Sequence, residues 1–107
     1  MNLDQIIESS FQIIMFSGNA RSMAMEAISK ARDGQIDESR QLLAEARTEI
    51  NQAHRFQTKL IQAEANGEKN EISVLLIHSQ DHLMNGMTVL DLAEEFICLY
   101  ELVNSQK

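Results

Sequence analysis

Hydrophobic residues recur at every third or fourth position along most of this chain, which is the spacing of amphipathic α-helices. Clustered turn-forming residues occur in two stretches, DGQID at 33–37 and NGEKN at 66–70, and they divide the chain into three segments of similar length. The pattern predicts an all-α fold, an antiparallel three-helix bundle, in a single domain over residues 1–107. The inner positions of the first two helices are predicted to be Ile6, Ile13, Ala20, Ala24, Ala27 and Ala31, followed by Leu43, Ala46, Ile50, Ala53, Leu60 and Ala63.

Residues that favour helix ends give approximate boundaries for the three segments. Asn2 followed three residues later by Gln5 resembles a capping box, and the glycine of the first turn stretch is a suitable stop for the first helix. Asp37 or Ser39 is expected to cap the second helix, which should run to about residue 66. The third helix is expected to begin at a cap on Asn70 and to run to about residue 104.

A glycine interrupts the first predicted helix. Gly18 stands in mid-helix, where glycine costs about 1 kcal/mol relative to alanine. Two explanations fit such a residue: the close approach of a second helix, or open space beside a functional site.

The third segment has hydrophobic residues on two faces rather than one. A helix of this kind needs partners on both faces, and two neighbouring helices of the same chain can fully cover only one of them. The second stripe therefore predicts self-association through the third helix, most simply in a symmetric oligomer, with a broad inner face in a monomer as the alternative. The inner stripe comprises Ile72, Leu76, Leu83, Leu90, Ala93, Ile97 and Tyr100, and the second stripe comprises Val74, Ile77, Asp81, Thr88, Leu92 and Leu99.

Composition narrows the class of protein. Among 107 residues there are no prolines and four glycines, which disfavours an all-β chain with its many tight turns. The single cysteine, Cys98, excludes an intrachain disulfide and a cysteine-rich zinc site, and we expect it to be a small core residue in a reducing compartment. The formal net charge of −7 disfavours binding to nucleic acid or to anionic membranes. Residues 70–107, with six acidic residues and one basic residue, contribute most of this charge.

Targeting and membrane signals are not evident in the sequence. No apolar run approaches the ~20 residues that a membrane-spanning helix requires. The segment MNLDQIIE at 1–8 lacks the basic and apolar regions of a secretory signal. We therefore expect a cytoplasmic protein without direct membrane insertion.

The residues best suited to chemistry lie together in the run LLIHSQDHLM at 75–84. His78, Asp81 and His82 are three and four positions apart, so a helix places them on one face. A histidine in this setting can be a packed structural residue, a metal ligand, a proton carrier or a nucleophile that accepts a phosphoryl group. His78 and His82 also have the spacing of a helical zinc pair, to which His54 could add a third nitrogen, although the glutamate of the specific HExxH motif is absent.

Asp81 interrupts the second apolar stripe, between Ile77 and Thr88. If the third helix packs around a symmetry axis, several copies of this carboxylate meet there. At a separation of about 4 Å and an effective dielectric constant near 20, each pair repels by ~4 kcal/mol. A bound cation, shared protons or a wet cavity would relieve the repulsion, and a threefold axis would offer the oxygen ligands that an octahedral ion such as Mg²⁺ prefers. A hydrogen-bonded or water-exposed aspartate is the plain alternative.

Two motifs give the chain a resemblance to a known family. SGNARSMAMEAISKAR at 17–32 and IHSQDHLMN at 77–85, with the approach AEANGEKNEISVLLIH at 63–78, resemble the IIA component of the lactose/cellobiose family of the bacterial phosphoenolpyruvate-dependent sugar phosphotransferase system. The likeness covers nearly the whole chain, and the two motifs together are far more specific than either one alone.

The resemblance implies a three-helix protomer that forms a homotrimer and is phosphorylated on His78. It implies that Gln80 and His82 flank this active site, and that Asp81 is the metal aspartate of the trimer axis, where Mg²⁺ would be structural. The implied partners are the histidine-containing phosphocarrier protein, which donates the phosphoryl group, and the cysteine of a IIB component, which receives it during disaccharide uptake. The protein would then be a phosphotransferase component that contacts other proteins rather than the sugar.

The chain departs from the family pattern in two places. Phe16-Ser17-Gly18 stands where members often carry His-Gly-Gly, and Asn85-Gly86 stands where they often carry Thr-Ser. These departures bear on the packing of the site and not on its reaction. Because few basic residues accompany the third helix, positive charge for phosphoryl transfer is expected to come largely from partner surfaces.

Three other hypotheses are open at this level. A two-component histidine phosphotransfer domain also carries phosphate on a helical histidine, but lysine and glycine typically follow that histidine, whereas SQDH follows here. A noncatalytic coiled-coil adaptor with a metal-pinned core would form a stable oligomer and accept no phosphate. A helical protein that binds divalent metal would use His78, His82 and His54.

Overall fold

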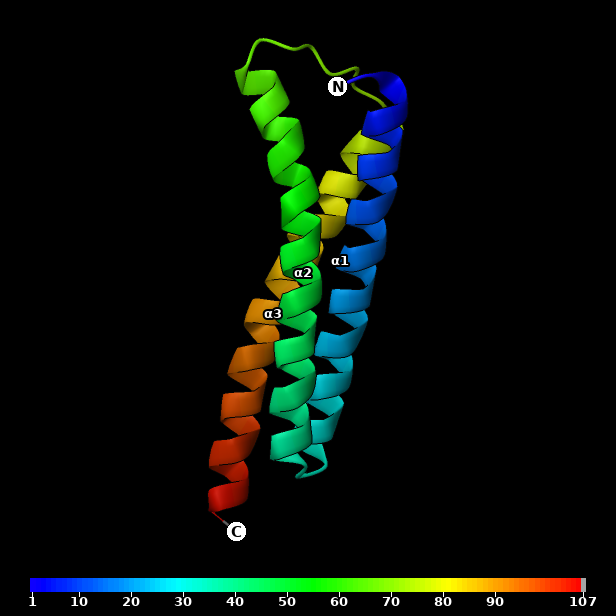
Figure 1. Cartoon of the computed structure of the whole chain (residues 1–107). Helices are drawn as coiled ribbons and strands as arrows, with labels where there is room; N and C mark the ends of the chain where they lie inside the picture. Colours follow the sequence, from blue (N-terminus) through cyan, green and yellow to red (C-terminus); the bar gives the residue numbers. More distant parts are fainter. Residues whose placement is uncertain (107) are drawn as a thin grey trace.

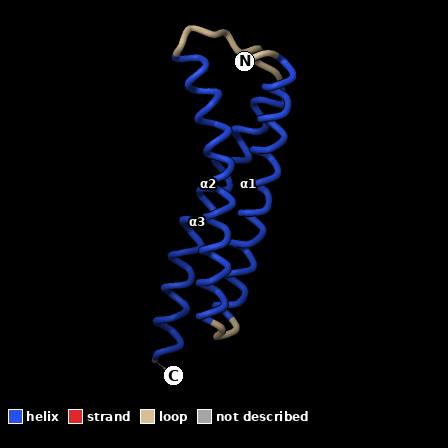
Figure 2. The backbone as a smooth tube through the Cα atoms, viewed as in Figure 1, coloured by secondary structure: helices blue, strands red, loops and turns tan. Residues whose placement is uncertain are grey.

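The computed structural model describes residues 1–106 and consists of three long helices, which confirms the predicted all-α fold. α1 spans Leu3–Arg32, α2 spans Ile36–Ala65 and α3 spans Val74–Ser105. α1 and α3 run in the same direction and α2 runs antiparallel to both, in a bundle with extents of 58 × 19 × 18 Å (Figure 1). Loops at opposite ends of the bundle join the helices (Figure 2).

The predicted capping box of α1 is confirmed. The backbone N–H of Gln5 donates to Oδ1 of Asn2 at 2.8 Å, and the backbone N–H of Asn2 donates to Oε1 of Gln5 at 3.0 Å. These bonds satisfy donors that the first turn of a helix leaves without intrahelical partners. Gly34 and Gly67, with φ of +85° and +89°, follow the ends of α1 and α2 and adopt the left-handed conformation that glycine tolerates best.

The predicted cap of α2 is wrong. The helix begins at Ile36 with Gln35 as its N-cap and has no side-chain capping bond, so Asp37 already lies in the first turn. Ser39 is buried, and its hydroxyl donates to the carbonyl of Ala27 on α1 at 2.6 Å. A short polar side chain near a helix start has several possible partners, and here the neighbouring helix supplies the one that Ser39 uses.

The predicted cap of α3 is also displaced. Ser73 is the N-cap, and its hydroxyl accepts the backbone N–H of Leu76 at 3.1 Å. Asn70 lies in the preceding loop and donates its side-chain amide to the carbonyl of Leu60 near the end of α2, at 3.2 Å. Asn70 therefore links the loop to α2, and α3 begins three residues later than predicted, at Val74.

The hydrophobic core matches the predicted inner positions of α1 and α2, all of which are buried. α3 completes the core with Leu83, Leu90, Ala93 and Ile97, while Leu76 and Tyr100 are half-buried. The prediction is wrong for Ile72, which is 77% exposed. This residue precedes α3, so helical spacing does not apply to it.

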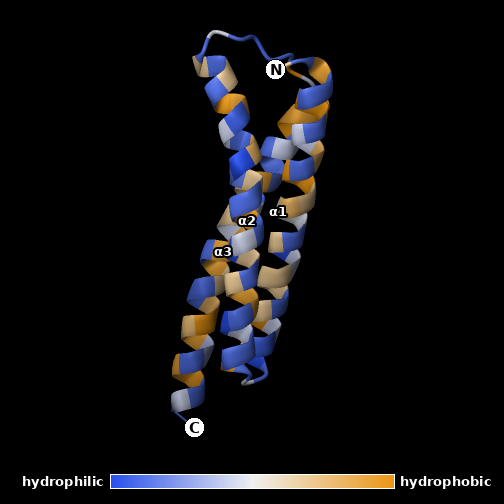
Figure 3. Ribbon diagram, viewed as in Figure 1, coloured by the Kyte–Doolittle hydropathy of each residue, from blue (hydrophilic) through white to orange (hydrophobic). Residues whose placement is uncertain are grey.

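One face of α3 has no partner within the chain. Val74 and Ile77 are 84% and 60% exposed, and Leu92 and Leu99 are exposed as well. Figure 3 shows hydrophobic residues along the length of α3, including the part that extends beyond the other two helices. None of the helices within residues 1–106 combines the length and the hydrophobicity needed to cross a membrane. The exposure rejects a broad inner face as the explanation of the second stripe, because neither α1 nor α2 covers it.

Cys98 is exposed, so its predicted place in the core is wrong. It follows the buried Ile97, and the next position along a helix is turned by about 100° away from the core. Its sulfur lies 3.9 Å from Nη2 of Arg40, which is also 3.2 Å from a carboxylate oxygen of Glu101. These hydrogen bonds, with Cys98 and then with Glu101, raise the pKa of the Arg40 guanidinium above its usual value.

Candidate functional site

His78 and His82 lie side by side near the start of α3. Their Nε2 atoms are 3.1 Å apart, and their rings meet edge to face, with centroids 4.4 Å apart and planes at 89°. His78 is exposed, whereas His82 is half-buried. A hydrogen bond between two neutral imidazoles needs one nitrogen with a proton and one with a free lone pair. If His82 is the donor, His78 keeps a lone pair on Nε2 and a proton on Nδ1, which is the tautomer that a nucleophile at Nε2 requires.

Buried residues on the core-facing side of α3 determine the direction of His78. Ser79 and Leu83 are fully buried. The hydroxyl of Ser79 donates to the carbonyl of Leu76 at 2.6 Å, one turn earlier in the helix. Because these residues fix the rotation of α3 against the core, the position before Ser79 is held at the surface.

A hollow of about 390 Å³ lies beside His82, between α3 and α1. Gly18, Arg21, Ser22 and Met25 of α1 line it together with His82. A Cβ at Gly18 would meet no atom within 4 Å, so the close approach of a second helix does not explain this glycine. The other explanation holds instead: the open space at Gly18 lies beside a candidate site.

Arg21 is a functional candidate that sequence reasoning did not single out. It is exposed, forms no ion pair within residues 1–106, and brings positive charge to the hollow that His82 lines. The expectation that such charge comes largely from partner surfaces stays a prediction. Arg21 is the one basic residue among positions 1–29, and it stands three positions after the mid-helix glycine. A lone basic residue about one helical turn after a mid-helix glycine is the sequence feature that could have pointed to Arg21.

The two departures from the family pattern meet where α1 contacts α3. A Cβ at Gly86 would lie 3.0 Å from Cδ1 of Ile50, 3.3 Å from the carbonyl oxygen of Ser17 and 3.7 Å from its Cβ. Gly86, and not Gly18, is thus the glycine of a close helix approach. Ser17 is buried, and its hydroxyl has no hydrogen-bond partner among the described residues. At position 17 the family pattern has glycine and this chain has serine, and at position 86 the pattern has serine and this chain has glycine. The two departures therefore swap a glycine and a serine between the two helices at one contact.

Gln80 points toward α2 rather than toward the histidines. Its Oε1 accepts a hydrogen bond from Nε2 of Gln57 at 2.8 Å, and its amide nitrogen lies 3.3 Å from the hydroxyl of Ser79. It also lines a separate hollow of about 450 Å³, formed with α2 and the loop before α3. Two positions along a helix correspond to a turn of about 200°. In a single chain, therefore, the structure does not bring Gln80 next to His78.

Asp81 lies exposed on the face of α3 that has no partner. Within residues 1–106 no group of three His, Cys, Asp or Glu side chains is arranged to hold a metal ion, so His54 does not complete a site with His78 and His82. A lone carboxylate suits Mg²⁺ poorly, because the ion requires several oxygen ligands. The residues of this chain fit such an ion only where several copies of Asp81 meet.

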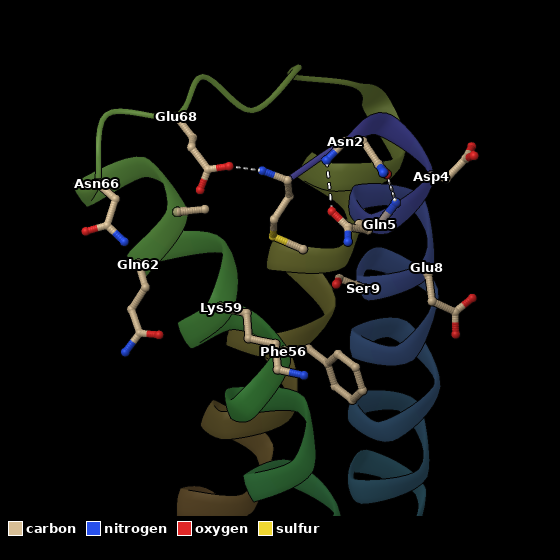
Figure 4. A pocket seen from close by; sticks show the side chains of 12 residues that line it. Asn2, Asp4, Gln5, Glu8, Ser9, Phe56, Lys59, Gln62, Asn66 and Glu68 are labelled. Atoms are coloured by element: carbon tan, nitrogen blue, oxygen red, sulfur yellow. Dashed lines mark hydrogen bonds and ion pairs between the residues drawn. The ribbon is translucent and has the colours of Figure 1, made fainter.

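A larger hollow, of about 680 Å³, lies at the end of the bundle where α1 begins and α2 ends (Figure 4). Acidic and basic side chains line it, including Glu8 and Lys59, and the amine of Met1 forms an ion pair with Glu68. It contains none of the residues that the sequence predicts for the site.

The geometry near the start of α3 suits one kind of chemistry. An exposed imidazole suits covalent group transfer, and an arginine that lines the adjoining hollow suits a group that is negatively charged. The fold and the site thus define a small helical carrier of an anionic group.

Known proteins identify that class more closely. The chain matches the family described as PTS system, lactose/cellobiose specific IIA subunit, over residues 8–101. It is 52% identical over 105 residues to the lichenan-specific phosphotransferase enzyme IIA component of Bacillus subtilis (strain 168), which covers 98% of this chain and 93% of that protein. The crystal structure of the PTS cellobiose-specific enzyme IIA from Bacillus anthracis has a TM-score of 0.94 at 52% identity, over 100% of this chain and 96% of that one. The solution structure of the IIA(chitobiose)–HPr complex from Escherichia coli has a TM-score of 0.80 at 35% identity, over 92% and 96%.

The chain belongs to the lactose/cellobiose-specific IIA subunits of the phosphotransferase system. It is a phosphoryl carrier of a sugar phosphotransferase system, and hence a phosphotransferase component. The resemblance carried by the two sequence motifs is confirmed. The two-component phosphotransfer domain, the noncatalytic adaptor and the three-histidine metal protein are not favoured by these matches.

Proposed function

We propose that His78 accepts the phosphoryl group in this IIA protein and that Nε2 is the acceptor atom. The observation that carries the proposal is the exposure of this residue: among the three histidines of the chain, His78 is exposed, whereas His54 and His82 are half-buried. An acceptor that serves two protein partners in turn must be reachable by both. The Nε2 atom of His78 also faces Nε2 of His82. An N–H at that His82 nitrogen can hydrogen-bond to His78 and so favour the tautomer in which Nε2 of His78 has a free lone pair.

The transfer step follows from the chemistry of the imidazole. A phosphohistidine of the donor protein docks against His78, and the lone pair on Nε2 attacks phosphorus in line with the donor's P–N bond. That bond breaks, and its electron pair returns to the donor's imidazole, which was protonated on its other nitrogen and leaves as a neutral ring. His78 carries its proton on Nδ1 during the attack and can release it to solvent afterwards.

The two residues that flank His78 in the motif have different proposed parts. The N–H of His82 loses its nitrogen acceptor when the P–N bond forms, and it then donates to a phosphoryl oxygen. Within one chain, Gln80 can donate to the phosphoryl group on His78 only after its side chain leaves the hydrogen bond with Gln57. We therefore assign the larger contribution to His82.

The phosphoryl donor is proposed to be the histidine-containing phosphocarrier protein, HPr. The relative from Escherichia coli supports this assignment, since its IIA(chitobiose) forms a complex with HPr. The recipient is proposed to be the cysteine of a IIB component, which phosphorylates a disaccharide during uptake. Both exchanges place the protein in the cytoplasm, with protein partners, no nucleic acid and no insertion into the membrane.

The working assembly is proposed to be a homotrimer packed through α3. The exposed stripe that includes Ile77 and Leu92 supports it, because this stripe has no partner in one chain. On a threefold axis, copies of Asp81 would meet, and a structural Mg²⁺ held by their carboxylates would offset their mutual repulsion. The ion takes no part in the transfer.

Incubation with phosphoenolpyruvate, enzyme I and HPr tests the assignment of His78. The wild-type protein and a His54→Gln variant are expected to gain an acid-labile phosphoryl group, whereas His78→Gln is expected to gain none. The two variants are matched, because each replaces one imidazole by an amide. Full labelling of His78→Gln, or a wild-type protein that takes up no phosphate, would overturn the proposal.

A further inference from the structure

Arg21 lies in the hollow beside the paired histidines and has no charge partner within residues 1–106. Arg21 and His82 are the two titratable side chains among the five residues that line this hollow. By contrast, Arg32, Arg40 and Arg47 each form an ion pair with a carboxylate. A guanidinium that faces a cavity without a carboxylate is available to an anionic ligand.

The surroundings of His78 make such a cation useful. Residues 70–106 include six acidic residues and neither lysine nor arginine. A phosphoryl group adds a charge of about −1.5 to −2 to this helix, and nearby carboxylates oppose it unless a cation lies close. Among the residues that line the hollow at His82, Arg21 on α1 is the one that supplies a permanent positive charge.

The hollow that Arg21 lines is open beside Gly18. Side chains on an α-helix lean toward its N-terminus, over the residues three and four positions earlier, so Gly18 occupies the position over which a side chain at Arg21 can extend. A Cβ at Gly18 would meet nothing within 4 Å, so the arm of the arginine is not obstructed there. His82 connects the hollow to the acceptor, because its ring lines the hollow while its Nε2 lies 3.1 Å from Nε2 of His78.

We propose that Arg21 binds the oxygens of the phosphoryl group carried by His78, and that Gly18 keeps open the space in which the guanidinium moves. This inference rests on the proposed function of His78. The planar fork of N–H donors matches two phosphoryl oxygens at once. Arg21 favours the phosphorylated state over the free state, because only the former offers it an anion. It thereby holds the group on the carrier between the donor and the recipient.

Three variants test the proposal: Arg21→Gln, Arg21→Lys and Arg55→Gln. Arg55 is the matched control, because it is exposed, has no ion pair within residues 1–106, and lines none of the three hollows described above. ³¹P NMR measures the equilibrium between phosphorylated HPr and each variant. Arg21→Gln is expected to lower the equilibrium constant for phosphorylation about tenfold, which corresponds to ~1.4 kcal/mol. Arg21→Lys should lie between Arg21→Gln and the wild type, and Arg55→Gln should equal the wild type.

A titration of the phosphohistidine provides a signature that a merely structural role would not change. A neighbouring guanidinium stabilises the dianion, so the phosphoryl group should titrate at higher pH in Arg21→Gln than in the wild type or in Arg55→Gln. An Arg21→Gln variant with the wild-type equilibrium and the wild-type titration curve would overturn the inference while leaving the function of His78 intact. A wild-type protein that HPr cannot phosphorylate would overturn the function itself and the inference with it, so the two failures are distinguishable.

Discussion

The Nε2 atoms of His78 and His82 lie 3.1 Å apart, so each imidazole depends on the protonation of the other. A phosphoryl group on Nε2 of His78 cannot coexist with this hydrogen bond, because the same lone pair forms the P–N bond. On the proposed assignment, with His82 as the donor, its N–H would turn from this nitrogen to a phosphoryl oxygen as the transfer proceeds. In that proposal, the pair would hold the nucleophile's tautomer before transfer and bind the phosphoryl group afterwards.

Replacing His82 by phenylalanine removes this donor and retains a planar ring. We expect His82→Phe to slow phosphorylation by HPr about 10- to 100-fold, because a hydrogen bond to a charged group contributes ~1.5–3 kcal/mol. Rapid-quench measurement of the rate checks the prediction, with His54→Phe as the control that should match the wild type. An unchanged rate in His82→Phe would show that His82 takes no part in the transfer.

The two mid-helix glycines should respond in opposite ways to a larger side chain. Gly18→Ala is expected to raise the free energy of unfolding by ~1 kcal/mol, because alanine is favoured in helices and the added methyl group meets no atom within 4 Å. Gly86→Val is expected to lower it by ~1–3 kcal/mol, because even a Cβ there comes within 3.3 Å of the Ser17 carbonyl oxygen. Urea unfolding followed by circular dichroism measures both. Destabilisation of similar size in the two variants would contradict the assignment of Gly86 as the point of close contact.

Asp81→Leu tests the proposed meeting of carboxylates on an axis. Leucine continues the apolar stripe and removes a repulsion of ~4 kcal/mol for each pair at about 4 Å. The variant should form a trimer at least as stable as that of the wild type, and its stability should no longer depend on Mg²⁺. Sedimentation equilibrium with and without EDTA measures both properties, and Asp91→Leu serves as a control at another exposed aspartate of α3. A monomeric or unfolded Asp81→Leu would argue against an axial cluster.

The sequence predicted best those parts of the fold in which a helix packs on one face. Every position predicted as inner in α1 and α2 is buried, although the buried serines of these helices, among them Ser10 and Ser17, were not predicted. Local patterns failed where a tertiary contact decides the outcome. Ser39 bonds to the carbonyl of Ala27 on another helix, and nothing near either residue in the sequence indicates this. Cys98 is small and apolar but lies one position beyond the buried stripe, so residue type alone misplaced it.

In the candidate site, too, the sequence predicted what depends on spacing within one helix and missed what depends on contacts between helices. The spacing of His78 and His82 within one helix sufficed to predict that they share a face, and the structure places them in contact. Arg21 comes from α1, and its place beside His82 depends on how two helices pack, which spacing within either helix does not reveal. Gln80 was assigned by motif, yet its two-residue offset from His78 turns it toward Gln57. The oligomer was predicted from a stripe that the single chain indeed leaves exposed.

The identity of the atom bonded to phosphorus tests the central claim most directly. The protein is labelled with ¹⁵N in its imidazole rings, phosphorylated through HPr, and examined by ¹⁵N–³¹P correlation NMR. We predict one phosphohistidine, with phosphorus bonded to Nε2 of His78 and with the hydrogen bond from His82 moved off that nitrogen. A phosphoryl group on Nδ1 of His78, on His82 or on His54 would contradict the proposed mechanism.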